Sequence, residues 1–207
     1  MARVKICGLN DAEGFDAAVQ AGADWIGLNF FPPSPRYVTP PQAAALAARA
    51  PHGPPRVGLF VAPTEADIQA VLNELRLDAL QLYTDAATAA ALRVRFGLPV
   101  WLAVGVSEAA DLPHDAAGID ALLIEAKPPP GATRPGGNAV AIDWTLLSGW
   151  AAPAPWLLAG GLTPDNVAAA VRATAAPAVD VSSGVECRRG SKDPALIRAF
   201  IAAAKNA

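Results

Sequence analysis

The sequence contains few of the residues that often carry out catalysis or bind metals. Among its 207 residues are only two histidines, His52 and His114, and two cysteines, Cys7 and Cys187. Two cysteines so far apart in the chain do not make a disulfide framework, and we expect both thiols to be reduced. So few histidines argue against a histidine-rich metal site.

Positive charge and long apolar segments are also scarce. The formal net charge is -3 and the sequence pI is about 5.3, so there is no basic field to attract nucleic acid or anionic lipid. The apolar residues form short runs, none of which reaches the roughly 18 residues of a membrane-spanning helix. No basic and apolar leader opens the chain. We therefore expect an unprocessed cytoplasmic protein that binds neither nucleic acid nor membrane.

What the chain does have is a regular series of short aliphatic runs. With 53% hydrophobic residues it can build one sizeable core, and we expect residues 1–207 to form a single domain. Each run is typical of a strand that is buried on both faces. The eight runs span residues 3–9, 24–31, 56–61, 78–83, 99–105, 120–126, 155–161 and 178–184.

Helix signals separate these runs. The N-caps that we expect are Asn10, Thr39, Thr163 and Asp193. The connections around 107–112 and 143–149 are shorter and have weaker helix signals. Strand followed by helix, eight times, predicts a (βα)8 barrel, that is, an α/β fold of the TIM-barrel type. The alternation alone leaves an open doubly wound sheet as an alternative.

A barrel of this kind places its active site where the strands end. Polar residues do gather at the predicted strand ends, whereas both histidines fall in helix-to-strand connections at the opposite rim, which argues against a histidine base or a Ser-His hydrolase. The polar residues at the strand ends are Cys7, Asn29, Gln81, Tyr83, Glu125, Lys127, Asp180, Ser182 and Ser183.

Glycines at the last two strand ends suggest a phosphate site. Gly160 and Gly161 end the seventh run, and Ser183 and Gly184 end the eighth. Barrels often bind phosphate at these two junctions through backbone N–H groups. A tight turn that needs positive φ is the alternative explanation of the glycine pair.

Several motifs resemble those of one enzyme family along the whole chain. They are "KICGL" at 5–9, "GADWIGLNFFPPSPRYV" at 22–38, "VGLFV" at 57–61, "LQLYTD" at 80–85, "PGGNAVAIDW" at 135–144, "AGGLTPDNV" at 159–167, "VDVSSGVE" at 179–186 and "KD" at 192–193. The chain resembles phosphoribosylanthranilate isomerase. The resemblance implies a (βα)8 barrel without cofactor or metal, which isomerises a small phosphorylated aminosugar in tryptophan biosynthesis by an Amadori rearrangement.

The resemblance also implies roles for individual residues. Cys7 would be the general base and Glu125 the general acid, while Arg36 would bind the anthranilate carboxylate and Asp180 another part of the substrate. Lys5 lies on the same strand face as Cys7, where it either favours a thiolate or forms an internal ion pair. The sequence does not indicate the oligomeric state.

Two positions depart from the family pattern. Glu125 stands where the family has aspartate, and its carboxyl reaches one methylene further; Asp143 or Asp180 remains open as an alternative acid. Tyr83 stands where histidine is common. Two other functions therefore stay under consideration: a lyase with a Schiff base on Lys5 or Lys127, and a barrel that binds the ligand without converting it. We interpret the segment 125–140 as either a lid or an ordinary surface loop.

Overall fold

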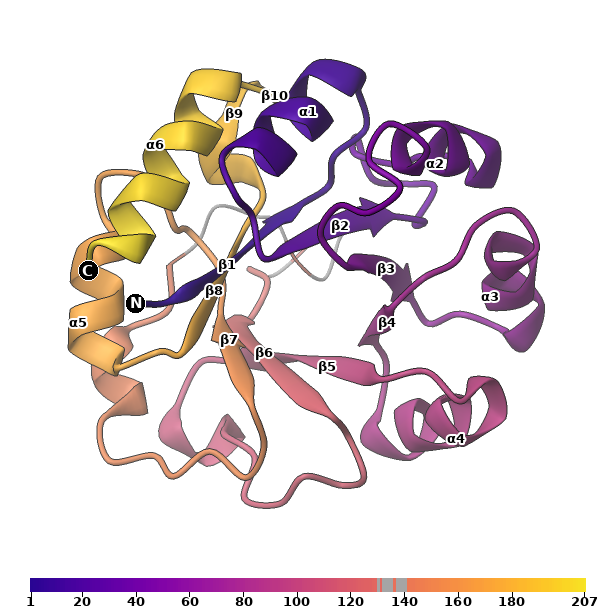
Figure 1. The fold of residues 1–207 in the computed structure, drawn as a ribbon. Helices are drawn as coiled ribbons and strands as arrows, with labels where there is room; N and C mark the ends of the chain where they lie inside the picture. The colour runs from indigo at the N-terminus through magenta and orange to yellow at the C-terminus, as the bar shows by residue number, and fades with distance from the viewer. Residues whose placement is uncertain (130, 132–135, 137–140) are drawn as a thin grey trace.

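The eight predicted strands form a closed parallel barrel. The computed structural model describes residues 1–129, 131, 136 and 141–207. Strand β1 pairs with both β2 and β8, which closes the sheet and excludes the open alternative. Figure 1 looks along the barrel. The strands are β1 (Arg3–Cys7), β2 (Trp25–Asn29), β3 (Arg56–Val61), β4 (Ala79–Tyr83), β5 (Val100–Val106), β6 (Ala121–Ala126), β7 (Trp156–Leu158) and β8 (Ala178–Val181).

Helices surround the barrel, but not after every strand (Figure 1). The α-helices are α1 (Ala12–Gln20), α2 (Pro40–Ala47), α3 (Glu65–Leu72), α4 (Ala86–Phe96), α5 (Val167–Thr174) and α6 (Pro194–Lys205). In the described part of the connections after β5 and β6 we find only the 3-10 turns η1 (Ala109–Asp111) and η2 (Trp144–Leu147). The predicted (βα)8 barrel is thus confirmed, and the two connections without an α-helix among the described residues are those whose helix signals were weakest.

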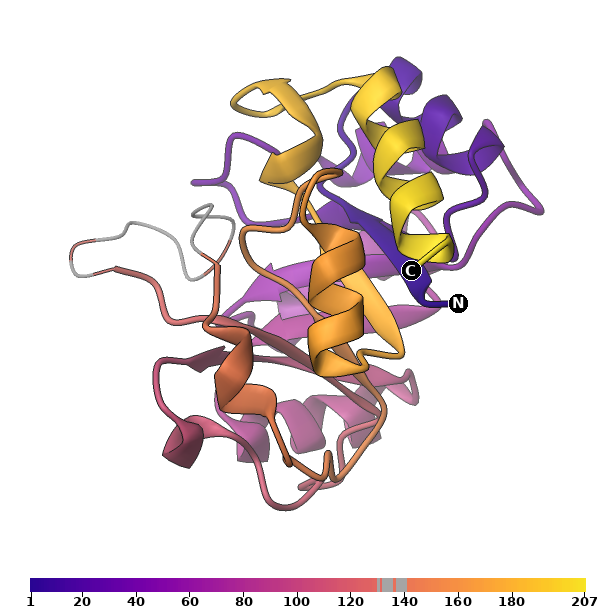
Figure 2. The same cartoon turned by 90° about the vertical axis from the view of Figure 1, so that its left-hand side faces the viewer.

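A short hairpin follows β8. The 3-10 turn η3 (Ser183–Val185) leads into β9 (Glu186–Arg188), which pairs with β10 (Ser191–Lys192) just before α6. Helix α6 returns the chain to β1 and α1, so the two termini lie beside each other in Figures 1 and 2. No helix among the described residues has both the length and the apolar character needed to span a membrane.

Two of the four predicted N-caps are confirmed. Thr39 caps α2 and Asp193 caps α6. Helix α1 is capped by Asp11 instead of Asn10, because the Asp11 carboxylate accepts from the N–H of Gly14 and Asn10 is used elsewhere. Helix α5 starts after Asn166 rather than Thr163. The Asn166 side chain accepts the N–H of Thr163, at 2.8 Å, and the Thr163 carbonyl accepts from the N–H of Val167, so Thr163 is bonded to the first turn although the α-helix itself begins at Val167.

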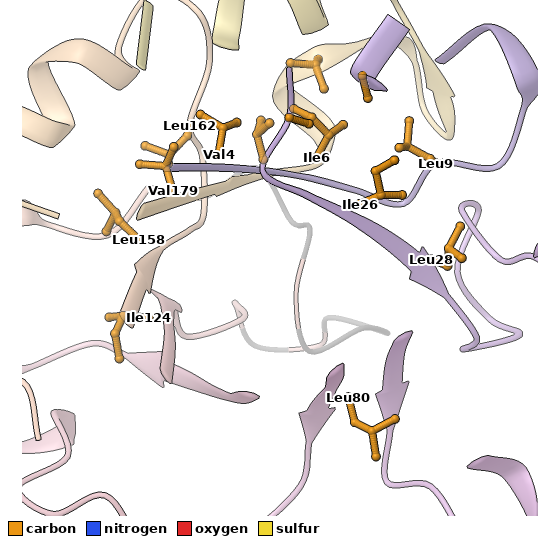
Figure 3. Packing of buried hydrophobic residues seen from close by; sticks show 14 of the residues in the cluster. Val4, Ile6, Leu9, Ile26, Leu28, Leu80, Ile124, Leu158, Leu162 and Val179 are labelled. Atoms are coloured by element: carbon orange, nitrogen blue, oxygen red, sulfur yellow. The ribbon is translucent and has the colours of Figure 1, made fainter. Parts of the chain in front are cut away.

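The strands alternate between two different surroundings. Every second side chain packs outward against the helices, and Figure 3 shows this apolar layer. The remaining side chains point into the barrel. At the lower end of the barrel, where the strands have their N-terminal ends, these side chains are apolar. Trp25 and Trp101 meet there edge to face, with ring centroids 5.2 Å apart. At the upper end of the barrel, where the strands have their C-terminal ends, the inward positions include the buried polar residues Lys5, Gln81, Glu125 and Asp180.

Candidate active site

The C-terminal ends of the strands surround one cavity of about 670 Å³, including its open mouth. All the site residues predicted from the sequence line it: Cys7, Arg36, Glu125, Asp180, Gly160, Gly161, Ser183 and Gly184. The two histidines do not line it, since His52 follows α2 and His114 precedes β6. The structure therefore brings the predicted residues together and leaves both histidines outside.

Cys7 ends β1 and is buried, only 4% exposed. Lys5, two residues earlier on the same face, has no exposed surface and places its Nζ 2.7 Å from the Asp180 carboxylate on the neighbouring strand. Burial alone would lower the pKa of Lys5, but the negative charges of Asp180 and Cys7 have the larger combined effect. The pKa of Lys5 is therefore raised. Of the two readings of Lys5, the internal ion pair is confirmed.

The surroundings of Cys7 disfavour its thiolate form. Burial raises its pKa above the ordinary value, although Lys5 and, more weakly, Lys192 act in the opposite direction. Lys5 has a limited effect because Asp180 neutralises it and itself disfavours a second negative charge nearby. Lys5 therefore lowers the pKa of Cys7 by less than burial raises it, and the net shift of the pKa is upward.

Glu125 lies on β6 at the same rim and is 6% exposed. Burial raises the pKa of its carboxyl to about 8, with a smaller contribution from Asp180, so the group holds its proton at neutral pH. Tyr83 on β4 lies beside it: a Cβ added to Gly136 would contact the Tyr83 hydroxyl and would lie 2.7 Å from Glu125 Oε1. Glu125 is thus a protonated acid within the cavity.

Other charged groups that could have substituted for these are placed elsewhere. Asp143 caps η2 and does not line the cavity. Lys127 is half exposed and pairs with Asp111 at 2.6 Å, also away from the cavity. Neither a second acid from Asp143 nor a Schiff base on Lys127 is supported. Lys5, held as a charged ammonium by Asp180, is poorly suited to a Schiff base, which requires a neutral amine.

Arg36 reaches the cavity from the loop after β2 and is 4% exposed. Its Nε and Nη2 donate to the two carboxylate oxygens of Glu186, at 2.5 and 3.0 Å. The side chain lies directly over Gly8, where an added Cβ would be 2.6 Å from the Arg36 Cδ. Gly8 also has a φ of +72°, so the glycine that follows Cys7 is required both by the backbone and by Arg36.

The glycines after β7 and β8 serve close backbone packing as well as lining the cavity. Gly160 and Gly161 have φ of +83° and +62°, which confirms the tight turn. A Cβ at Gly161 would lie 2.6 Å from the backbone nitrogen of Ala141, and one at Gly184 would collide with the Leu162 carbonyl. The two loops are therefore pressed together at the position expected for a phosphate.

Gln81 was predicted to lie at a strand end, but no role in the site was predicted for it. It points into the barrel from β4, has no exposed surface, and lines the cavity. Both polar atoms of its amide lack a partner among the described residues. Burying an amide without hydrogen-bond partners costs about 1–3 kcal/mol of stability, so a ligand that offers hydrogen bonds to this amide would be bound favourably. The available signal was a polar residue at an inward strand position, two before Tyr83.

The structure's donor groups do not suggest a metal centre. Across residues 1–129, 131, 136 and 141–207, no group of three or more His, Cys, Asp or Glu side chains is placed to hold an ion. Both cysteines are free, Cys7 buried and Cys187 exposed. Part of the segment 125–140, interpreted from the sequence as a lid or a surface loop, lies outside the described residues.

Comparisons with known proteins agree with this geometry. The sequence model of the family described as N-(5'phosphoribosyl)anthranilate (PRA) isomerase matches residues 4–203. The N-(5'-phosphoribosyl)anthranilate isomerase of Acidiphilium cryptum is 61% identical over 204 residues, covering 99% of this chain and 98% of that protein.

Solved structures are similar over the whole chain. The phosphoribosyl anthranilate isomerase of Thermotoga maritima superposes with a TM-score of 0.86 at 34% identity, covering 100% of both chains. A second structure of such an isomerase, in complex with reduced 1-(o-carboxyphenylamino)-1-deoxyribulose 5-phosphate, gives a TM-score of 0.84 at 32% identity, again covering both chains fully. The chain belongs to the phosphoribosylanthranilate isomerase family.

Proposed function

We propose that residues 1–207 form one catalytic domain that converts N-(5-phosphoribosyl)anthranilate into 1-(2-carboxyphenylamino)-1-deoxyribulose 5-phosphate, with Cys7 as general base and Glu125 as general acid. Family membership makes the chain an isomerase of tryptophan biosynthesis. The observation that carries the assignment of roles is that a buried thiol and a buried protonated carboxyl line one cavity.

The chemistry follows from these two groups. Glu125 donates its proton to the ring oxygen as the bond from that oxygen to C1 breaks, which leaves a Schiff base between C1 and the anthranilate nitrogen. The Cys7 thiolate then removes the proton from C2, and the electron pair moves to form an enolamine. Tautomerisation of the enolamine gives the ketone of the product. No redox partner is needed, because C1 is reduced as C2 is oxidised.

Binding groups surround this pair. The Arg36 guanidinium offers a planar fork to the anthranilate carboxylate. Backbone groups of Gly160, Gly161, Ser183 and Gly184 form the phosphate seat. Asp180 and the amide of Gln81, which has no partner in the described part of the chain, face the space between these ends, where the sugar hydroxyls would lie. The relative that carries a phosphorylated carboxyphenylamino ligand supports a substrate of this class.

Turnover of the substrate by matched cysteine variants tests the proposal. The reaction is followed by the loss of substrate fluorescence. We expect Cys7→Ala to lower kcat at least about a hundredfold, since removing a general base typically costs 10²–10⁴. Cys187→Ala removes the exposed thiol and should leave the rate unchanged. A Cys7→Ala enzyme with near wild-type turnover would disprove the assignment.

A protein that binds the substrate but does not convert it would support the second hypothesis, of a barrel without catalysis. For the lyase hypothesis, borohydride trapping with a carbonyl substrate should give no lysine adduct.

We also propose that the protein works in the cytoplasm.

A further inference from the structure

Glu186 is the last residue of the motif "VDVSSGVE" and has no role in the chemistry above. Its side chain is 4% exposed and its two oxygens accept four hydrogen bonds. Oε1 accepts from Arg36 Nε and Lys192 Nζ, at 2.5 and 3.0 Å. Oε2 accepts from Arg36 Nη2 and the N–H of Gly190, both at 3.0 Å. Every acceptor position of the carboxylate is filled by the protein, so Glu186 is built to hold neighbours and not a ligand.

Lys192, from the "KD" motif, completes the cluster. Its side chain has no exposed surface. Besides Glu186, its ammonium donates to the carbonyl and the hydroxyl of Ser182, at 2.8 and 3.2 Å. Three acceptors match the three donors of an ammonium group. Burial lowers the pKa of Lys192, whereas Glu186 supports its charged form. The residue thus ties the carboxylate of Glu186 to the loop that follows β8.

The pairing leaves Arg36 with one free edge. A guanidinium can hold a carboxylate side-on through Nε and one terminal nitrogen, or end-on through both terminal nitrogens. Glu186 occupies the side-on edge. Nη1 has no hydrogen-bond partner among the described residues, and Arg36 lines the cavity, so the end-on edge is the one available to a ligand.

The charges of the cluster do not cancel. Arg36 and Lys192 are both cations, and Glu186 is the one anion that contacts them in the described part of the chain. The nearby pair Lys5 and Asp180 is neutral overall. A buried cluster with one uncompensated positive charge is stabilised by a single added anion.

We propose that Glu186, held by Lys192, is the positioning residue that fixes Arg36 with its end-on edge toward the cavity, and that this cluster makes the enzyme selective for substrates with a carboxylate on the aromatic ring. The inference rests on the proposed function and extends it. Glu186 touches no reacting atom. Its effect is transmitted through the orientation of Arg36.

The test compares two ligands on two proteins. One ligand is reduced 1-(o-carboxyphenylamino)-1-deoxyribulose 5-phosphate, and the other is the same molecule without the carboxylate. Titration calorimetry gives the ratio of their Kd values, which does not depend on the fraction of protein that is folded. In the wild type we expect the carboxylated ligand to bind at least about tenfold more tightly, as for a charge-assisted hydrogen bond.

In Glu186→Gln the ratio should fall about tenfold toward unity, because the amide has only one acceptor oxygen and cannot hold both Arg36 nitrogens. If only charge mattered, the preference for the carboxylated ligand would grow in Glu186→Gln, because removing an anion leaves the cluster more positive. A ratio that is unchanged or larger in Glu186→Gln would therefore overturn the inference. A loss of affinity equal for both ligands would also overturn it, because that is the result of a merely structural role.

Controls separate this inference from the proposed function. Glu65→Gln removes an exposed carboxylate that pairs with Arg95 and should leave the ratio unchanged. If Glu186→Gln does not fold, Glu186→Asp replaces it, because aspartate keeps the charge but is shorter by one methylene. This variant should lose most of the preference for the carboxylated ligand. A wild-type ratio in Glu186→Asp would count against the inference. A wild type that shows no preference would instead contradict the substrate assignment itself.

Discussion

The two ends of the barrel interior are built from the same strands but have opposite chemistry. At the lower end the inward residues are Trp25, Val57, Ala79, Trp101, Ala121, Leu157 and Ala178, which pack without polar groups. At the upper end, one or two inward positions further along, they include Lys5, Cys7, Gln81, Glu125 and Asp180, all of them buried. Stability is thus concentrated at one end of each strand and reactivity at the other.

This difference explains why buried ionisable groups are tolerated here. Lys5 and Asp180 compensate each other, as do Arg36 and Glu186. The groups proposed to react, Cys7 and Glu125, form no ion pair with a described residue. Burial therefore raises the pKa of both and favours their neutral, protonated forms. Paired charges hold the upper end together, while the unpaired groups remain available for proton transfer.

The largest effect on function is expected from Glu125→Gln. The change removes the transferable proton and should lower kcat about 10²–10⁴-fold. It should not destabilise the fold, because the native carboxyl is already buried and neutral near pH 7. Steady-state rates and thermal melting measure the two quantities. Glu125→Asp, which keeps the acid but shortens it, should lie between this variant and the wild type. Equal rates for Glu125→Gln and the wild type would exclude Glu125 as the acid.

The opposite pattern is expected at the lower end. Trp101→Ala opens a cavity beside Trp25 and should lower the free energy of unfolding by about 3–5 kcal/mol. The kcat of the folded protein should stay close to that of the wild type. Denaturant unfolding and steady-state kinetics below the melting temperature test this. A large loss of kcat with little loss of stability would break the separation between the two ends.

A smaller effect is expected at the phosphate loops. Gly184→Ala forces a Cβ against the Leu162 carbonyl, so the two loops must separate. We expect KM for the phosphorylated substrate to rise about tenfold, in line with the cost of a small misplacement, with kcat changed less. Gly97→Ala is a control outside the cavity: its φ of +64° makes alanine cost some stability, but nothing lies near its Cβ position, so KM should stay unchanged. Equal KM values in both variants would argue against a phosphate seat at Gly184.

Much of this arrangement could be predicted from the sequence, because its signals are local. The strand runs and the caps at Thr39 and Asp193 follow from neighbouring residues. The site residues followed from their positions at strand ends and from the family resemblance. The prediction of Asn10 as an N-cap was wrong because the next residue, Asp11, accepts from the first turn of α1. The Asn10 side chain donates instead to the carbonyl of Gly190, at 3.0 Å.

What could not be predicted depends on contacts between distant parts of the chain. Arg36 and Glu186 are separated by 150 residues, and no local pattern shows that they pair. The raised pKa of Cys7 is a second case, because the sequence shows Lys5 nearby but neither the burial of the thiol nor the pairing of Lys5 with Asp180. The amide of Gln81, which finds no partner within residues 1–129, 131, 136 and 141–207, is likewise evident only in the closed barrel.

The pH dependence of kcat/KM tests the central claim most directly, since it reports the protonation states of the free enzyme. The reactive form needs Cys7 deprotonated and Glu125 protonated. The pKa of the thiol is raised above its ordinary value, and that of the carboxyl is about 8, so this form is always a minority and is most populated between the two values. We predict a bell-shaped profile that rises with pH to about 8 and falls only above the thiol's pKa. A profile that peaks in the acidic range and declines through neutrality would contradict the account.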